Sequence, residues 1–122
     1  MNIDNFGDYF RIKRIELGLT LRTFCLRYNY DPGNISRLER NILSPSLDND
    51  KLSALATALQ IKQDSQEWVL FHDLAHTAKG QIPADIKHRE ATNQLLPAFF
   101  RTMRNKKLSK KKLQKLIKLL NE

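Results

Sequence analysis

The stretch that decides the fold is residues 20–40, which read TLRTFCLRYNYDPGNISRLER. Apolar residues recur within 21–28 at i, i+3, i+4 and i+7, a spacing that predicts an amphipathic helix. A second helix is expected to begin at Pro32, because Asp31 can cap it and proline suits the first helical position. Two short helices joined by a tight connection at 29–30 have the length and spacing of a helix-turn-helix.

Helical spacing of apolar residues also extends outward from this stretch in both directions. Only four glycines and four prolines interrupt the 122 residues, and we find no alternating strand pattern and no internal repeat. A helix is expected over 6–17. After the helix that begins at Pro32, we expect one helix that ends near Leu59 and another from Ser65 to Gly80. Beyond them we expect three more segments: a helix over 86–96, a short helix after Pro97, and a last helix from Ser109. The predicted fold class is therefore all-α.

The charge of the chain is concentrated near its C-terminus. Lys and Arg total 21 against 13 Asp and Glu, which gives a net charge of +8. Residues 1–100 hold 12 basic and 12 acidic side chains, whereas residues 101–122 hold nine basic and one acidic. With 41% hydrophobic residues the chain can build a core, which excludes disorder throughout. We expect a domain over residues 1–79 and a basic helical extension over residues 80–122.

Cysteine usage and hydropathy bear on the compartment. The single cysteine, Cys25, excludes an internal disulfide framework and favours a reducing compartment. Residues 1–10 contain two acids and no apolar run, so no signal peptide is expected. The longest apolar stretch, around residues 95–100, is too short to cross a bilayer. These features predict a cytoplasmic protein with no membrane partner.

The helix that begins at Pro32 is expected to have an inward and an outward face. The inward face is formed by Ile35, Leu38 and Ile42. The outward face and its flanks hold Gly33, Asn34, Ser36, Arg37 and Arg40. Arginine can donate two hydrogen bonds to guanine, and asparagine can pair with adenine, so this face suits a duplex groove. The simpler alternative is that the two arginines are ordinary solvated surface charges.

Two charged residues fall on stripes that are expected to face the core. Arg14 lies four residues after Phe10 on the apolar stripe of the first helix, and Glu39 lies beside Ile35. Burying opposite charges is costly unless they meet, so we expect Arg14 and Glu39 to form a structural ion pair.

A resemblance rests on these residues. The segment KRIELGLTLRTFCLRYNYDPGNISRLERN (13–41), continued by LSALATALQI (52–61), resembles the XRE family of Cro and phage-repressor helix-turn-helix proteins. The resemblance implies a five-helix, lambda-repressor-like domain that binds operator DNA as a dimer. It implies base-reading roles for Gly33, Asn34, Ser36 and Arg37. It also implies phosphate contacts from the start of the second helix and the loop after the third, here Thr20, Arg22, Arg40 and Asn41.

The chain departs from the family pattern at Leu21 and Asn41, which lie in the two regions of expected phosphate contact. Leu21 stands where the family often has glutamine, so we expect Arg22 to supply the contact that is lost. Asn41 stands where the family usually has glycine; it tolerates a left-handed backbone and can donate to phosphate.

The C-terminal segment is expected to form an amphipathic helix. Its apolar stripe is Leu113, Leu116, Ile117 and Leu120, and five lysines occupy the other side. The stripe needs a partner, which is a second copy of the chain, the chain's own core or a separate protein. The segment 96–102, together with the lysine-rich turn and the helix after it, is also similar to tails of small XRE-type regulators, some of them antitoxin-like.

Two histidines and the single cysteine are further candidates for metal binding or catalysis. His72 and His76 have i, i+4 spacing around Asp73, similar to the zinc-protease HExxH motif but with a shorter acid. Histidines at this spacing are more often partly buried helix residues. Cys25 is expected to be a buried structural thiol rather than a nucleophile. We therefore expect no enzyme, no metal site and no cofactor.

The predicted function is a sequence-specific DNA-binding transcriptional regulator, a repressor that binds a palindromic operator as a homodimer. Its expected partner is double-stranded DNA. One alternative is an antitoxin that represses its own operon and binds a cognate toxin. Another is a helical interaction or RNA-binding protein that does not read DNA.

Overall fold

The computed structural model describes residues 5–106 and 109–121, without the side chains of residues 92 and 93. Within these residues every regular element is an α-helix, so the all-α prediction is confirmed. The helices are α1 (Phe6–Glu16), α2 (Leu21–Tyr28), α3 (Pro32–Glu39), α4 (Asn49–Ala58), α5 (Gln66–Ala78), α6 (Ala84–Lys87), α7 (Glu90–Lys106) and α8 (Lys110–Leu120). Residues 1–4, part of the segment on which the expected absence of a signal peptide rests, lie outside the described residues.

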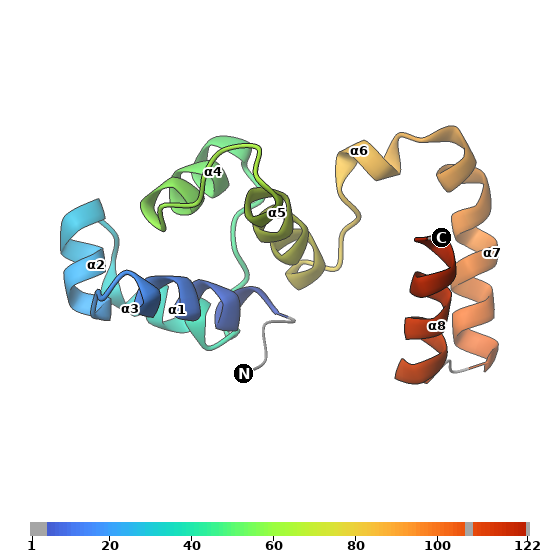
Figure 1. The fold of residues 1–122 in the computed structure, drawn as a ribbon, viewed down its shortest axis with the longest axis horizontal. Helices are drawn as coiled ribbons and strands as arrows, with labels where there is room; N and C mark the ends of the chain where they lie inside the picture. The colour runs from blue at the N-terminus through green and yellow to red at the C-terminus, as the bar shows by residue number, and fades with distance from the viewer. Residues whose placement is uncertain (1–4, 107–108, 122) are drawn as a thin grey trace. The chain divides into compact units, whose positions relative to one another are not determined.

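The chain divides into two compact units, unit 1 (Met1–Pro83) and unit 2 (Ala84–Glu122). In unit 1, α1 contacts both α3 and α5, α2 contacts α3, and α4 contacts α5. In unit 2, α6 contacts α7, and α8 runs in the opposite direction to α7 (Figure 1). Helix α1 is therefore the element that joins the helices of unit 1.

Local sequence signals explain where the helices begin and end. The side chains of Thr20 and Asp31 accept a hydrogen bond from the backbone amide three residues later, so both expected caps form. Asn29 ends α2 in the left-handed conformation, with φ 61°. Pro32 occupies the first turn of α3, where its missing N–H leaves no helical hydrogen bond unmade.

The core of unit 1 is built around four phenylalanines that are no more than 1% exposed. Phe10 meets Phe24 edge to face at 5.6 Å between ring centroids, which joins α1 to α2. Phe6 meets Phe71 at 4.9 Å, which joins α1 to α5. Burying one such side chain contributes about 1.5–3 kcal/mol, so these rings fix the packing of α1.

An ion pair at the surface of unit 1 also joins α1 to α5. Lys13 Nζ lies 2.8 Å from Glu67 Oε1 and 3.6 Å from Glu16 Oε2. The same ammonium lies 5.6 Å from the centroid of the Tyr9 ring. The pKa of Lys13 is raised: burial acts to lower it, but the hydrogen bond to Glu67 and the nearby negative charges outweigh this.

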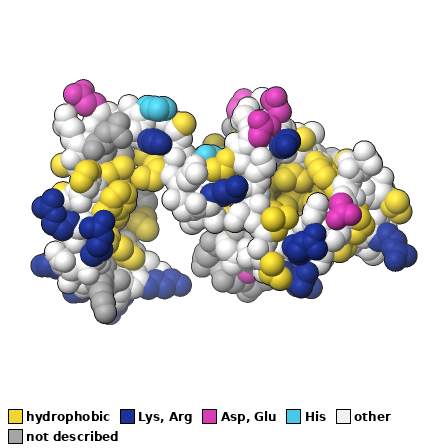
Figure 2. Space-filling view, turned by 180° about the vertical axis from the view of Figure 1, so that it is seen from behind, with side chains coloured by type: hydrophobic (Ala, Val, Ile, Leu, Met, Phe, Trp, Pro, Cys, Tyr) yellow, Lys and Arg dark blue, Asp and Glu magenta, His cyan; other side chains and the backbone are white. Residues whose placement is uncertain are grey.

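Unit 2 has a different kind of surface. No described side chain of α6 or α8 is buried, and the described side chains of α7 are exposed or half-buried. Large apolar residues of these helices are more than a third exposed: Ile86, Leu95, Phe99, Phe100, Leu116, Ile117, Leu119 and Leu120. Figure 2 shows a strip of hydrophobic side chains over this unit, flanked by Lys and Arg. Among the described residues, no helix combines the length and apolar character needed to span a bilayer.

Three expectations about local structure were wrong. One helix was expected over 86–96, but α6 ends at Lys87 and α7 begins at Glu90. Pro97 was expected to end a helix, but it lies inside α7. Proline in a helix interior costs about 3 kcal/mol, so the rest of α7 outweighs the loss of one backbone hydrogen bond. Ile42 was expected on the inward face of α3, but it is 64% exposed because α3 ends at Glu39 and the helical phase does not continue to residue 42.

Candidate nucleic-acid interface

The connection between α2 and α3 is short and anchored in the core. Tyr30 N donates to the Cys25 carbonyl at 2.9 Å, directly after the left-handed Asn29. The Tyr30 ring stacks on Phe24, with ring centroids 6.0 Å apart and an interplanar angle of 6°. This packing and the contact between the two helices fix how α3 is held relative to α2.

Helix α3 has one buried face and one solvent face. Ile35 is 4% exposed and Leu38 is 5% exposed, both within the core cluster of unit 1. The candidate base-reading residues lie away from this face: Asn34 and Arg37 are exposed, and Gly33 and Ser36 are half-buried. Four candidate residues are thus brought together on the N-terminal two turns of one helix.

The two longest of these side chains are joined to each other. Arg37 Nη2 donates to Asn34 Oδ1 at 2.6 Å, and both residues are exposed. This bond was not predicted from the sequence, although the i, i+3 spacing on a helix was a signal for it. The exposed Arg40 lies beyond them, where its Nε donates to the Ser36 carbonyl at 3.3 Å.

The candidate phosphate-contacting residues occupy both ends of the interface. Thr20 Oγ1 is used locally, since it accepts from Thr23 N at 3.1 Å and donates to Thr23 Oγ1 at 2.8 Å. Arg22 is exposed and borders a hollow between α2 and α3. Asn41 is left-handed, with φ 60°, as expected. Its Oδ1 accepts from Gly7 N at 2.9 Å, so its Nδ2 is the group that remains for a phosphate.

Arg14 and Glu39 form a buried two-point ion pair. Arg14 Nε donates to Glu39 Oε2 at 2.7 Å, and Arg14 Nη2 donates to Oε1 at 2.9 Å. Arg14 is 8% exposed and Glu39 is 7% exposed. A third bond runs from Arg14 Nη1 to the Leu19 carbonyl at 2.7 Å, just before α2. One guanidinium therefore joins α1, the segment before α2 and the C-terminal turn of α3.

The hydrogen bonds raise the pKa of Arg14, and the bonds to Glu39 are the largest cause. Burial acts in the opposite direction, because it disfavours the charged form. Charge-assisted bonds at two points fix geometry as well as supplying energy. The pair thus orients α3 on α1.

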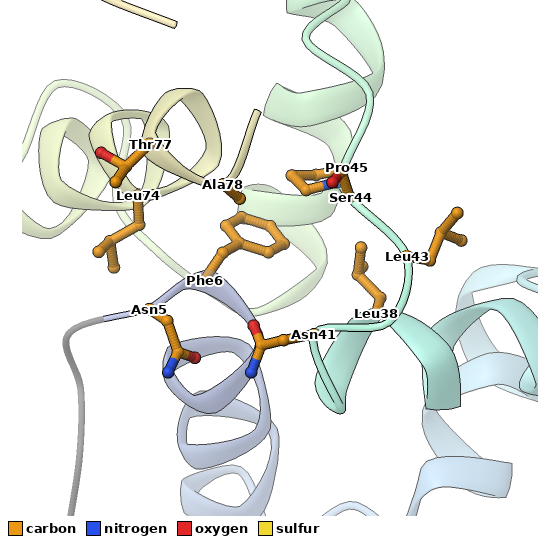
Figure 3. A pocket seen from close by; sticks show the side chains of 10 residues that line it. All are labelled: Asn5, Phe6, Leu38, Asn41, Leu43, Ser44, Pro45, Leu74, Thr77 and Ala78. Atoms are coloured by element: carbon orange, nitrogen blue, oxygen red, sulfur yellow. The ribbon is translucent and has the colours of Figure 1, made fainter. Parts of the chain in front are cut away.

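A close backbone contact sets the other edge of α3. An added Cβ on Gly7 would lie 2.6 Å from the Leu38 carbonyl and 2.7 Å from the Glu39 carbonyl. Only glycine permits this approach, which explains a glycine inside α1. Asn41 lies beside the start of α1 (Figure 3), and it lines a hollow of about 310 Å³. The Gly7–Asn41 contact was not predicted from the sequence, although an unexplained helical glycine was a signal for it.

The two candidate metal-binding histidines have structural partners, and the candidate thiol is buried. His72 Nδ1 lies 2.8 Å from the Trp68 carbonyl, and His76 Nδ1 lies 2.8 Å from the His72 carbonyl. Within the described residues there is no group of three or more His, Cys, Asp and Glu side chains that could hold a metal. Cys25 is 2% exposed, and burial raises the pKa of its thiol.

The candidate dimer or partner residues lie on α8. Leu113 is half-buried, whereas Leu116, Ile117 and Leu120 are 39%, 57% and 79% exposed. The lysines of the same helix are all exposed. Residues 84–122 contain 11 basic and three acidic side chains, whereas residues 1–83 contain ten of each, so unit 2 carries the whole excess charge.

No family model, curated protein or solved structure matches the chain.

Proposed function

We propose that this protein is a sequence-specific DNA-binding transcriptional regulator. In this proposal α1 to α5 form a five-helix domain of the lambda-repressor type, and α2 and α3 are its helix-turn-helix. Helix α3 enters the major groove, which is wide enough for one helix. The protein represses transcription by binding a palindromic operator as a homodimer.

The observation that carries the proposal is the outward placement of Asn34 and Arg37 on a firmly held helix. Both side chains are exposed, while the opposite face of α3 is buried and its C-terminal turn is tied to α1 through Glu39. Base readout needs polar side chains that reach outward from a rigid support. A merely solvated face would not need the two-point ion pair that orients it.

The remaining charges support general attraction to DNA. Arg22 and Arg40 are exposed at the start of α2 and the end of α3, where they can contact phosphates. The excess of basic side chains in unit 2 adds affinity that does not depend on sequence.

The homodimer is supported by the exposed apolar stripe of α8. A second copy that covered Leu116, Ile117 and Leu120 would remove this surface from water. Two copies of α3 would then read half-sites about 34 Å apart, which is one helical turn of DNA.

Selection from a random duplex library tests the proposal. The full-length protein should enrich a palindrome, and Arg37→Ala should weaken binding to that site by about 1–3 kcal/mol while blurring its sequence preference. The matched control is Arg11→Ala, because Arg11 is an exposed arginine of α1 outside the candidate interface. Recovery of no enriched sequence, or equal losses in the two variants, would contradict base reading by α3.

A second candidate function is an antitoxin that represses its own operon and binds a toxin through unit 2. The observation that favours it is the same exposed apolar stripe on α8, which a toxin could cover in place of a second copy. Co-purification with the product of a neighbouring gene, lost in Leu116→Asp and Ile117→Asp, would support the antitoxin. A dimer that forms alone through these residues would support the regulator.

A further inference from the structure

The hydrogen bond between Arg37 and Asn34 gives the interface a defined chemistry. Arg37 Nη2 donates to Asn34 Oδ1 at 2.6 Å, so the arginine folds back along α3 toward its N-terminus. An added Cβ on Gly33 would lie 3.6 Å from both terminal nitrogens of Arg37. The guanidinium therefore lies over Gly33, where an added Cβ would be in ordinary contact with it and 3.1 Å from Asp31 Oδ2.

This arrangement uses the acceptor of Asn34 and leaves donors on the surface. A guanidinium has five N–H donors, and Nη2 belongs to both of its two-donor edges. One bond to Asn34 uses one hydrogen of Nη2, so one complete two-donor edge stays free. The Asn34 Nδ2 group adds two further donors. The joined pair thus presents N–H groups outward, while its one acceptor oxygen is engaged by a positive charge.

Among the four bases, guanine alone presents two acceptors and no donor on its major-groove edge. Adenine presents an acceptor and a donor, cytosine a donor, and thymine an acceptor beside a methyl group. We propose that the Asn34–Arg37 pair specifies a guanine in each half-site, an inference that rests on the proposed function. Arg37 contacts N7 and O6 of that guanine, and Asn34 is a positioning residue that holds the guanidinium.

The pairing argues against the adenine contact that asparagine makes in other settings. That contact requires the amide oxygen to accept from the adenine amino group. In this protein the same oxygen accepts a charge-assisted bond, which is stronger than a neutral one. An adenine amino group would have to donate to the second lone pair of that oxygen, directly beside a guanidinium whose positive charge repels the amino hydrogens.

The test begins with the duplex that the full-length protein selects from a random library. The half-site should contain a guanine whose replacement by adenine weakens binding about 5- to 150-fold. Replacing it by 7-deazaguanine, which lacks the N7 acceptor, should weaken binding about fivefold or more. Inosine at the same position is the matched control, because it keeps N7 and O6 and should leave binding unchanged.

The role of Asn34 is tested by the ratio of affinities for the guanine and 7-deazaguanine duplexes. Asn34→Ala should bring this ratio close to one while affinity for random DNA stays the same, a pattern that a fold defect would not produce. Arg37→Ala should also bring the ratio of the two affinities close to one. Arg37→Lys, which replaces the fork by a single ammonium, should reduce it.

Each contrary result has a distinct meaning. A selected site in which Asn34→Ala removes a preference for adenine, and leaves the guanine ratio intact, would overturn the inference alone. Equal losses on every duplex in Arg37→Ala would assign Arg37 to a phosphate, and would also overturn it. If no duplex is enriched, the proposed function fails and the inference fails with it.

Discussion

Unit 1 and unit 2 use phenylalanine in opposite ways. Phe6, Phe10 and Phe71 of unit 1 are at most 1% exposed, whereas Phe99 and Phe100 of unit 2 are 42% and 43% exposed. A buried ring contributes to the stability of its own domain, whereas an exposed ring contributes little and stays available to a partner. The comparison shows that the buried core lies in unit 1, whereas exposed apolar side chains occur in both units, for example Leu26 in unit 1 and Leu120 in unit 2.

The two units also distribute charge differently. Acidic and basic side chains balance in residues 1–83, so any DNA reading by unit 1 must come from where a few arginines are placed. Residues 84–122 hold nearly four basic side chains for each acidic one, which attracts any polyanion. In the proposed function, unit 1 selects the sequence and unit 2 raises affinity for all sequences.

The largest expected effect compares two matched phenylalanine substitutions. Phe71→Ala should lower the free energy of unfolding by about 3–5 kcal/mol, because the ring is fully buried and a cavity would remain. Phe99→Ala should lower it by less than about 1 kcal/mol, since that ring is already partly hydrated. Urea denaturation of both variants measures the difference. Similar losses would show that unit 2 has a cover, and a dependence on protein concentration would identify it as a second copy.

The next effect compares two ion pairs within unit 1. Glu39→Ala should lower the free energy of unfolding by about 3–5 kcal/mol, because it leaves the buried Arg14 charge without its partner. Glu67→Ala removes the exposed partner of Lys13 and should cost about 0–1 kcal/mol. Chemical denaturation measures both. A loss for Glu39→Ala as small as that for Glu67→Ala would mean that the buried pair does not hold α3 in place.

A smaller effect is expected on DNA affinity, and it tests the role of the basic side chains of unit 2. Replacing Lys111, Lys115 and Lys118 by glutamine should weaken binding to the selected and random duplexes by the same factor. The slope of log affinity against log salt should fall by up to about 0.9 for each phosphate contact that is lost. Fluorescence anisotropy over a range of salt concentrations measures this slope, with Lys62→Gln in unit 1 as the control. The proposed role of unit 2 would be wrong if only the selected duplex lost affinity.

The smallest effect is on the pH dependence of stability. Burial raises the pKa of the Cys25 thiol, and the nearby Glu39 and Asp31 charges add to this. The folded protein therefore holds the thiol proton more tightly than the unfolded chain does. This contribution is complete below the ordinary thiol pKa of about 8.5 and is lost as pH rises above it.

Cys25→Ala isolates the effect, because the pKa values of Tyr9 and Tyr30 are also raised and these groups act at still higher pH. Melting temperatures at pH 7.5 and 9.5 should fall less in Cys25→Ala than in the natural sequence. An equal fall in both proteins would rule out the thiol as the source.

Local chemistry made much of unit 1 predictable from the sequence. The caps at Thr20 and Asp31 were foreseen because an N-cap depends on neighbouring residues alone. Arg14 and Glu39 were expected to meet because each charge stood on a stripe of apolar residues, where burial without a partner is costly. Such inferences succeed when one residue type has few low-energy environments.

The features that were not predicted depend on packing between distant segments, or on a balance between opposing local effects. The Lys13–Glu67 and Gly7–Asn41 contacts join segments whose approach is set by the whole core, which the spacing of residues does not encode. Pro97 was expected to end a helix because proline in a helix interior costs about 3 kcal/mol, but α7 continues through it, and the spacing of residues does not show that the rest of the helix outweighs this cost. The Asn34–Arg37 bond could have been foreseen from its spacing, but only the structure gives its direction.

The three-way junction at Arg14 has a consequence for motion. Because one guanidinium joins α1, the Leu19 carbonyl and Glu39, α3 cannot loosen without breaking bonds to the other two segments. Amide protons in α3 should therefore exchange with solvent at rates close to those in α1, in a single opening event. In the proposed function, a reading helix that is already ordered in this way docks without a folding step, so encounter with the duplex rather than rearrangement of the protein would set the association rate.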